Sequence, residues 1–78
     1  MKIEVNAKGL KCPEPIMMLH KAVRESKAGD LIHITATDRS TERDIDKFCE
    51  FLGHSLIKKE ITEKCLYFVV QKKDKNII

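Results

Sequence analysis

Apolar residues along the chain follow two periods, and each period predicts one kind of element. Apolar side chains three or four positions apart predict a helix, and alternating or β-branched apolar residues predict strands. The clearest helical period consists of Ile45, Phe48, Cys49 and Leu52. In chain order the predicted elements are a strand at 3–5, a helix at 13–28, a strand at 31–37, a helix from 41 to 52, and strands at 56–62 and 65–72.

Residues with special backbone preferences mark the ends of the two predicted helices. Pro13 suits a helix start. Backbone N–H groups in the first turn have no partner within the helix, so a residue that lacks this group loses no hydrogen bond there. Gly29 can adopt the left-handed conformation that ends many helices. Thr41, followed three positions later by Asp44, resembles a capping box and predicts where the second helix begins.

The element order βαβαββ predicts one domain over residues 1–72, with a flexible basic tail at 73–78. A chain of this length can build a two-layer α/β (α+β) sandwich, in which two helices cover one face of a four-stranded mixed sheet. If the first two strands are parallel, both helices begin at the same edge of the sheet. Cys12 is then expected near the segment 38–43, at the edge where α/β folds often bind ligands.

Composition narrows the possible partners. The 78 residues include 15 basic and 12 acidic side chains, a net charge of +3 that is spread along the chain. Direct nucleic-acid binding is therefore not expected, because such proteins usually carry a stronger basic stripe. The longest apolar run, 65–70, is far shorter than the ~20 residues that span a bilayer. The N-terminal residues alternate and do not resemble a signal peptide.

Three widely spaced cysteines do not form a disulfide framework, so we expect free thiols in a reducing cytoplasm. Cys49 shares a helix face with apolar residues and is expected in the core. Cys65 is expected at the start of a strand and partly exposed. No short pair of metal ligands is present, so no metal site is predicted.

The segment Cys12-Pro13-Glu14-Pro15 carries the candidate chemistry. The prolines place Cys12 at the start of a helix, where the helix dipole favours a thiolate. The dipole contributes only ~0.3–1 kcal/mol, which is less than one pKa unit. The prolines remove two backbone donors and leave those of Glu14 and Ile16. The alternative is that Cys12 only caps the helix.

A single thiolate without a partner suits exchange with the sulfur of another protein. The chain has no Cys-x-x-Cys pair for an internal disulfide cycle, and His20 is expected two turns away from Cys12, too far for a general base. A thiol of moderate pKa is sufficient for such exchange. Arg39 and Arg43 could attract an acidic partner or stabilise a persulfide anion. The alternative is that they are ordinary solvated charges.

The stretch from Gly9 to Met18, which reads Gly-Leu-Lys-Cys-Pro-Glu-Pro-Ile-Met-Met, closely resembles the signature of the TusA (SirA-like) family of sulfur carriers. A second similar stretch runs from Thr41 to His54, and the resemblance covers about residues 3–72. It implies the βαβαββ sandwich and a persulfide-carrying cysteine at Cys12, which is the catalytic residue of a sulfurtransferase. At Lys11 the family commonly has Arg. Lysine keeps the positive charge, but it lacks the guanidinium group with which arginine can donate two parallel hydrogen bonds to one anion.

The resemblance also implies the partners. A cysteine desulfurase donates the sulfur, and a downstream relay protein accepts it for 2-thiolation of the wobble uridine in certain tRNAs; other members serve other sulfur routes. No metal, organic cofactor or membrane is implied, and we expect a monomer with transient interfaces. The alternatives are a small non-catalytic RNA-binding module and a regulatory interaction domain that uses the Cys12 edge only for docking.

Overall fold

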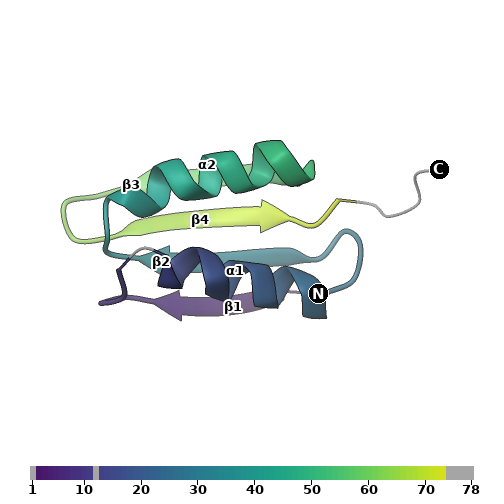
Figure 1. The fold of residues 1–78 in the computed structure, drawn as a ribbon, viewed down its shortest axis with the longest axis horizontal. Coiled ribbons are helices and arrows are strands. Elements are labelled where there is room, and N and C mark those ends of the chain that lie inside the picture. Colours follow the sequence, from purple (N-terminus) through teal and green to yellow (C-terminus); the bar gives the residue numbers. More distant parts are fainter. Residues whose placement is uncertain (1, 12, 74–78) are drawn as a thin grey trace.

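The structure is a computed structural model that describes residues 2–11 and 13–73. Its elements follow the predicted order βαβαββ (Figure 1). They are β1 (Lys2–Ala7), α1 (Glu14–Glu25), β2 (Leu31–Ala36), α2 (Ser40–Leu52), β3 (Ser55–Ile61) and β4 (Leu66–Gln71). Both helices lie on one face of the sheet, so the predicted two-layer architecture is confirmed.

The four strands form one mixed sheet in the order β1-β2-β4-β3. β1 pairs with β2 in parallel, and β4 pairs antiparallel with both β2 and β3. The register aligns Val5 with Ile34 and Ile34 with Phe68, so apolar side chains of three strands meet on the helical face. A register shift between Leu56 and Lys58 interrupts the pairing of the edge strand β3. The parallel pairing of β1 with β2 is thus confirmed, and with it the condition under which both helices begin at the same edge of the sheet.

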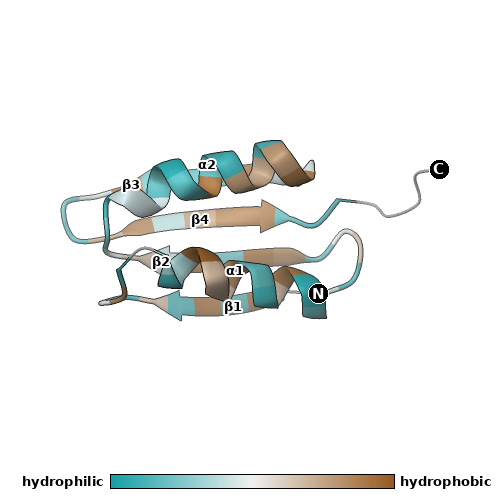
Figure 2. Ribbon diagram, viewed as in Figure 1, coloured by the Kyte–Doolittle hydropathy of each residue, from teal (hydrophilic) through white to brown (hydrophobic). Residues whose placement is uncertain are grey.

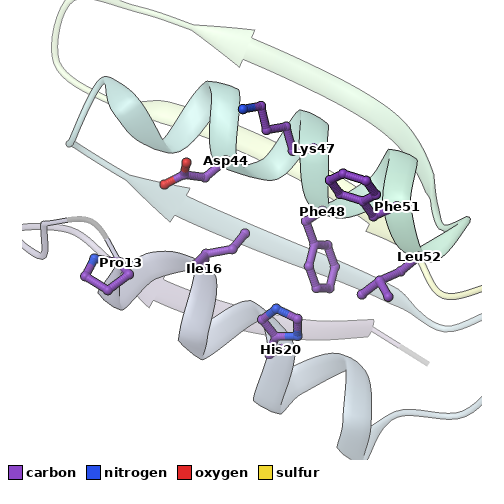
Figure 3. Close-up of a pocket in the computed structure, with 8 residues that line it drawn as sticks. All are labelled: Pro13, Ile16, His20, Asp44, Lys47, Phe48, Phe51 and Leu52. Atoms are coloured by element: carbon purple, nitrogen blue, oxygen red, sulfur yellow. The ribbon is translucent and has the colours of Figure 1, made fainter.

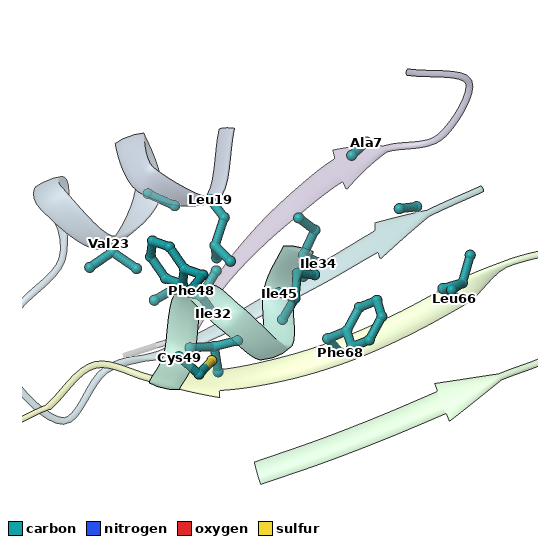
Figure 4. Close-up of a cluster of buried hydrophobic side chains, with 13 residues drawn as sticks. Ala7, Leu19, Val23, Ile32, Ile34, Ile45, Phe48, Cys49, Leu66 and Phe68 are labelled. Atoms are coloured by element: carbon teal, nitrogen blue, oxygen red, sulfur yellow. The ribbon is translucent and has the colours of Figure 1, made fainter. Parts of the chain in front are cut away.

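The core lies between the helices and the central strands. In β2, buried residues alternate with half-buried ones, and Ile32, Ile34 and Ala36 are fully buried. Leu19 and Val23 of α1, together with residues of α2, cover them (Figure 4). Figure 2 shows the matching pattern, with hydrophobic residues along β4 and a largely hydrophilic outer side of α2. Binary patterning thus decides which face of each element is buried.

Helix α1 ends at Glu25, three residues earlier than the predicted end at 28. The Ser26 hydroxyl donates a hydrogen bond to the Val23 carbonyl oxygen at 2.8 Å, and the Lys27 N–H donates to the Asp30 carboxylate at 2.9 Å. These side-chain bonds replace the next helical turn. Gly29 has a φ of 86° but lies in the turn that follows, where its N–H donates to the Lys72 carbonyl at 3.0 Å.

The predicted capping box at the start of α2 is wrong. The Asp38 carboxylate accepts hydrogen bonds from the Ser40 N–H at 3.0 Å and the Ser40 hydroxyl at 2.9 Å. The helix therefore begins at Ser40, with Arg39 in the N-cap position. Thr41 is fully buried, and within the described residues its hydroxyl has no hydrogen-bond partner. Asp38, and not Thr41, thus supplies the side-chain oxygen that accepts hydrogen bonds at the start of the helix.

Hydrogen bonds hold the chain after β4 against the domain as far as Lys73. The Lys72 N–H donates to the Asp30 carbonyl at 3.0 Å, and its ammonium group donates to the Ser26 carbonyl at 2.7 Å. The Lys73 N–H donates to Nδ1 of His54 at 3.0 Å. These bonds hold the first residue of the predicted tail, and the rest of that tail, 74–78, lies outside the described residues.

The contact between His54 and Lys73 predicts a loss of stability in mild acid. Burial, followed by the nearby charges of Lys73 and Lys72, lowers the pKa of His54 below its usual 6.5. Neutral His54 is therefore favoured in the folded state, and its contribution is present above pH 6.5 and is lost as the pH falls below that value. Urea midpoints measured at about pH 7.5 and about pH 5.5 test this.

The variant His54→Asn is the matched control for this pH dependence. Its side-chain oxygen can still accept a hydrogen bond, but it does not titrate. We expect a smaller fall in the urea midpoint between the two pH values in this variant than in the natural chain. Equal falls in the two proteins would contradict the role assigned to His54.

Candidate functional site

The loop after β1 is held against the end of β2. The Gly9 N–H donates a hydrogen bond to the Thr37 hydroxyl at 2.8 Å, and the Leu10 N–H donates to the Ala7 carbonyl at 3.2 Å. Gly9 has a φ of 81°, a conformation that glycine adopts without strain. The residues that lead to position 12 therefore lie at the carboxyl edge of the two parallel strands, as the topology predicted.

Helix α1 begins directly after this loop. Pro13 occupies the N-cap position, and the Met17 N–H donates to its carbonyl oxygen at 3.1 Å. Pro15 lies in the first turn and is buried, so the predicted use of both prolines is confirmed. The Glu14 N–H donates to the Lys11 carbonyl at 2.8 Å. This N–H is therefore engaged within the loop, and its expected part in holding a thiolate at position 12 stays a prediction.

Cys12 itself lies outside the described residues. The expectations that concern its exposure, its thiolate and its separation from His20 therefore stay predictions. The described residues on both sides of it, Lys11 and Pro13, are exposed. Together they fix where the chain enters and leaves position 12.

A groove of about 360 Å³ runs between α1 and α2 from this point (Figure 3). Pro13, the residue next to Cys12 in the chain, lies at one end of the groove near Asp44 of α2, and His20 and Leu52 lie at the other end. The groove is lined by Pro13, Ile16, His20, Asp44, Lys47, Phe48, Phe51 and Leu52. The fold thus brings the start of α1 against α2, two segments about 30 positions apart in the sequence.

Rings in edge-on and tilted contact lie at the far end of this groove. The His20 ring packs edge-on against Phe48 with the ring centroids 4.5 Å apart. His54 lies on another side of Phe48, with the centroids 5.4 Å apart and the rings tilted by 30°. Contacts of this kind favour defined ring orientations. His20 therefore faces α2, and Phe48 connects the groove to the residue that binds Lys73.

The groove is bordered by large apolar side chains that the fold leaves accessible. Phe51 is 81% exposed and Leu52 39%, and Met17 on the neighbouring surface of α1 is 60% exposed. Leu52 belongs to the same helical period as the buried Ile45, but it is exposed and lines the groove. Met18 packs against the core, so the two neighbouring methionines lie on opposite sides of α1. Exposed apolar groups of this size indicate an interaction surface.

Sequence reasoning missed the groove as a feature. The signal available was the pair Phe51 and Leu52, which extends the apolar stripe of α2 beyond the width that one core face needs. A stripe this wide predicts either a fully buried helix or a second contact surface. Only the position of α1 beside α2 shows that the second alternative applies.

The other two cysteines have different surroundings. Cys49 is buried in the core as predicted, and burial, reinforced by the charge of Asp46, raises the pKa of its thiol to about 11. Cys65 is half-buried in the turn before β4, where its N–H donates to the Thr62 hydroxyl at 3.1 Å. A buried thiol with a raised pKa is a poor nucleophile. Cys49 is therefore a structural residue.

The basic residues named from the sequence stand apart from the groove. Arg39 and Arg43 are exposed, and neither lines it. Within residues 2–11 and 13–73, no cluster of histidine, cysteine and carboxylate side chains could hold a metal ion. No helix in the same part of the chain is long and apolar enough to cross a membrane.

Comparisons with known proteins agree with this architecture. Residues 3–72 match the family described as Sulfurtransferase TusA. The chain is 51% identical over 70 residues to the "Sulfur carrier protein TusA" of Pseudomonas syringae pv. syringae, a match that covers 90% of this chain and 83% of the relative. It is 54% identical over 71 residues to the protein of the same name from Pseudomonas entomophila, covering 90% and 89%. The chain therefore belongs to the TusA sulfurtransferase family.

Proposed function

We propose that this protein is a sulfur carrier that uses Cys12 as its persulfide site. The observation that carries the proposal is the Cys12-Pro13-Glu14-Pro15 segment, which lies within the family match and whose Glu14 and Pro15 open the first turn of α1. Helix α1 begins at Glu14, where the prolines require, and a thiol beside a helix N-terminus is favoured as the thiolate.

The surroundings of the other cysteines support the choice of Cys12. Cys49 lies in the core with a raised pKa, and Cys65 lies in the hairpin turn between β3 and β4. The groove with its exposed Phe51 begins at Pro13, so a partner that reaches position 12 meets an apolar surface beside it. That surface can contribute to a transient interface while the thiol reacts.

The transfer consists of two balanced thiol-exchange steps. The Cys12 thiolate attacks the outer sulfur of a donor persulfide, so a new S–S bond forms while the old one breaks, and the donor leaves as a thiolate. Cys12 then carries the persulfide, whose outer sulfur is attacked in turn by an acceptor thiolate, and Cys12 returns to its thiolate form. Neither step requires a metal or an organic cofactor.

The partners follow from the same proposal. A cysteine desulfurase supplies the sulfur, and a relay protein accepts it on the route to the 2-thio group of the wobble uridine in certain tRNAs. The carrier acts as a monomer in the cytoplasm, where its cysteines stay reduced. The names of the relatives support the carrier role, and the donor and acceptor are the finer part of the proposal.

The proposal predicts that one sulfur atom is added to the protein. Incubation with a cysteine desulfurase and cysteine is expected to raise the intact mass by one sulfur, and a reductant is expected to reverse this gain. Peptide mapping under non-reducing conditions should place the sulfur on the peptide that contains Cys12. An unchanged mass, or a label on another cysteine, would contradict the proposal.

A further inference from the structure

The two edges of the sheet differ in how well they are protected against pairing with a further strand. At one edge, β3 has a register shift between Leu56 and Lys58, and irregularities of this kind protect edge strands. At the other edge, β1 pairs with β2 in an unbroken register from Lys2 to Ala7 (Figure 1). Within the part of the chain that the structure describes, no second strand pairs with β1. Its outer row of backbone groups is therefore open to pairing.

A groove of about 340 Å³ lies on the helical side of this edge, between β1 and α1. Two side chains of β1 and two of α1 form its apolar part, namely Ile3, Val5, Met18 and Ala22. Ala22 is buried, and the other three are half-buried and pack against the core from its margin. The exposed residues Lys21 and Glu25 also line the groove. An apolar side chain that enters here would therefore extend the existing core.

A second hollow, of about 410 Å³, lies on the other side of β1, on the sheet face that carries no helix. It is lined by Glu4, Val5, Asn6, Lys8, His33, Thr35 and Tyr67. His33 and Tyr67 form a hydrogen bond with each other, and the Lys58 ammonium group lies 6.0 Å from the centre of the Tyr67 ring. This hollow thus offers polar and charged groups, in contrast to the apolar groove.

Successive side chains of a strand point to opposite faces of its sheet, so a strand beside β1 sends alternate side chains into the groove and the hollow. We propose that an extended peptide segment of a partner protein adds to β1 as a fifth strand, with apolar side chains toward Met18 and polar ones toward His33. Main-chain hydrogen bonds to β1 hold the segment, and the groove selects its side chains. Among the described residues, none lines both this surface and the groove between α1 and α2. The β1 edge is therefore a second interaction site, separate from the proposed carrier chemistry.

A flexible peptide fits this edge better than a second copy of the chain. Ile3 and Val5 of a second copy already pack against their own core, so its β1 has no apolar side chain to place in the groove. The edge is also short, because six residues of a strand span about 20 Å. Pairing along this length covers only part of the ~800 Å² that each partner of a stable protein interface buries.

The test uses a peptide probe with capped ends, in which threonine alternates with valine and a lysine stands at each end for solubility. In the matched control peptide, a proline replaces the central valine, which removes one main-chain donor and prevents regular strand pairing. We expect the probe to cause saturable shifts in the amide NMR signals of Ile3, Val5 and Met18, while the signal of Phe51 stays in place. The proline peptide should bind about tenfold more weakly, because it cannot pair along the whole edge.

The variant Val5→Lys tests the same surface from the side of the protein. The lysine brings a charge to the apolar groove, so the affinity for the probe should fall about tenfold. Ile57→Lys is the matched control, because Ile57 is 54% exposed on β3 at the opposite edge of the sheet. A charge so far from the groove is screened, and the affinity should stay within about twofold of the natural value. If Val5→Lys does not fold, the two peptides on the natural chain still decide the question.

Three results would overturn the proposal. The first is the absence of saturable shifts along β1, and the second is equal binding of the two peptides, because strand pairing would then play no part. The third is a set of β1 signals that shift with protein concentration without any probe, because a second copy would then occupy the edge. None of these measurements involves Cys12. Failure at the β1 edge therefore leaves the carrier function standing, and failure of sulfur loading leaves the β1 edge standing.

Discussion

Replacing Cys12 by serine is expected to abolish sulfur loading, while Cys65→Ser and Cys49→Ala remain loaded. A serine hydroxyl is not ionised near neutral pH and cannot form a persulfide, so no fraction of the transfer survives at position 12. Cys65 is the matched control, because it is half-buried and accessible on a turn. Cys49 tests the core, where burial keeps the thiol protonated. Intact mass after incubation with desulfurase and cysteine measures all three.

Circular dichroism of the Cys12→Ser variant separates loss of chemistry from loss of fold. Serine is close to cysteine in size and shape, so the helical signal and the unfolding midpoint should stay close to those of the natural chain. Loading of the serine variant to the natural level would eliminate Cys12 as the carrier site. Loading that disappears only in Cys65→Ser would transfer the role to the hairpin turn.

Phe68→Ala is expected to have the largest effect on stability. Phe68 is fully buried in β4, opposite Ile34, and it is among the largest buried side chains. Truncating a buried phenylalanine costs about 3–5 kcal/mol through lost burial and the cavity left behind. A domain of this length has a free energy of unfolding on the order of 4–12 kcal/mol, so the variant loses a large share of it. Urea unfolding measures the difference.

Phe51→Ala is the matched control, because it makes the same substitution at an exposed position. Phe51 is 81% exposed, so its truncation should change the free energy of unfolding by no more than about 0.5 kcal/mol. The same substitution should weaken sulfur loading, because Phe51 lines the groove beside position 12. Equal destabilisation by the two variants would show that the packing of Phe68 described here is wrong.

The elements could be predicted because their signals are local. The period of α2 and the alternation in β2 depend on residues within one turn or two positions of each other, and both elements appear where expected. Gly53 ends α2 in a left-handed conformation with a φ of 78°, which glycine adopts without strain. The end of α1 and the start of α2 were harder to predict from the sequence. At each of these boundaries a side chain, Ser26 or Asp38, takes over hydrogen bonds that the helix backbone would otherwise make.

The sequence by itself determined the element order, the two-layer architecture, and the cysteine that precedes a proline-initiated helix. Only the tertiary structure decided that Leu52 lines a groove, that Lys72 and Lys73 are hydrogen-bonded to the domain, and that His54 contacts both Phe48 and Lys73. The physical reason is range. Periodicity and backbone preference act between neighbours along the chain, whereas a groove and a long-range hydrogen bond exist only when packing brings distant segments together.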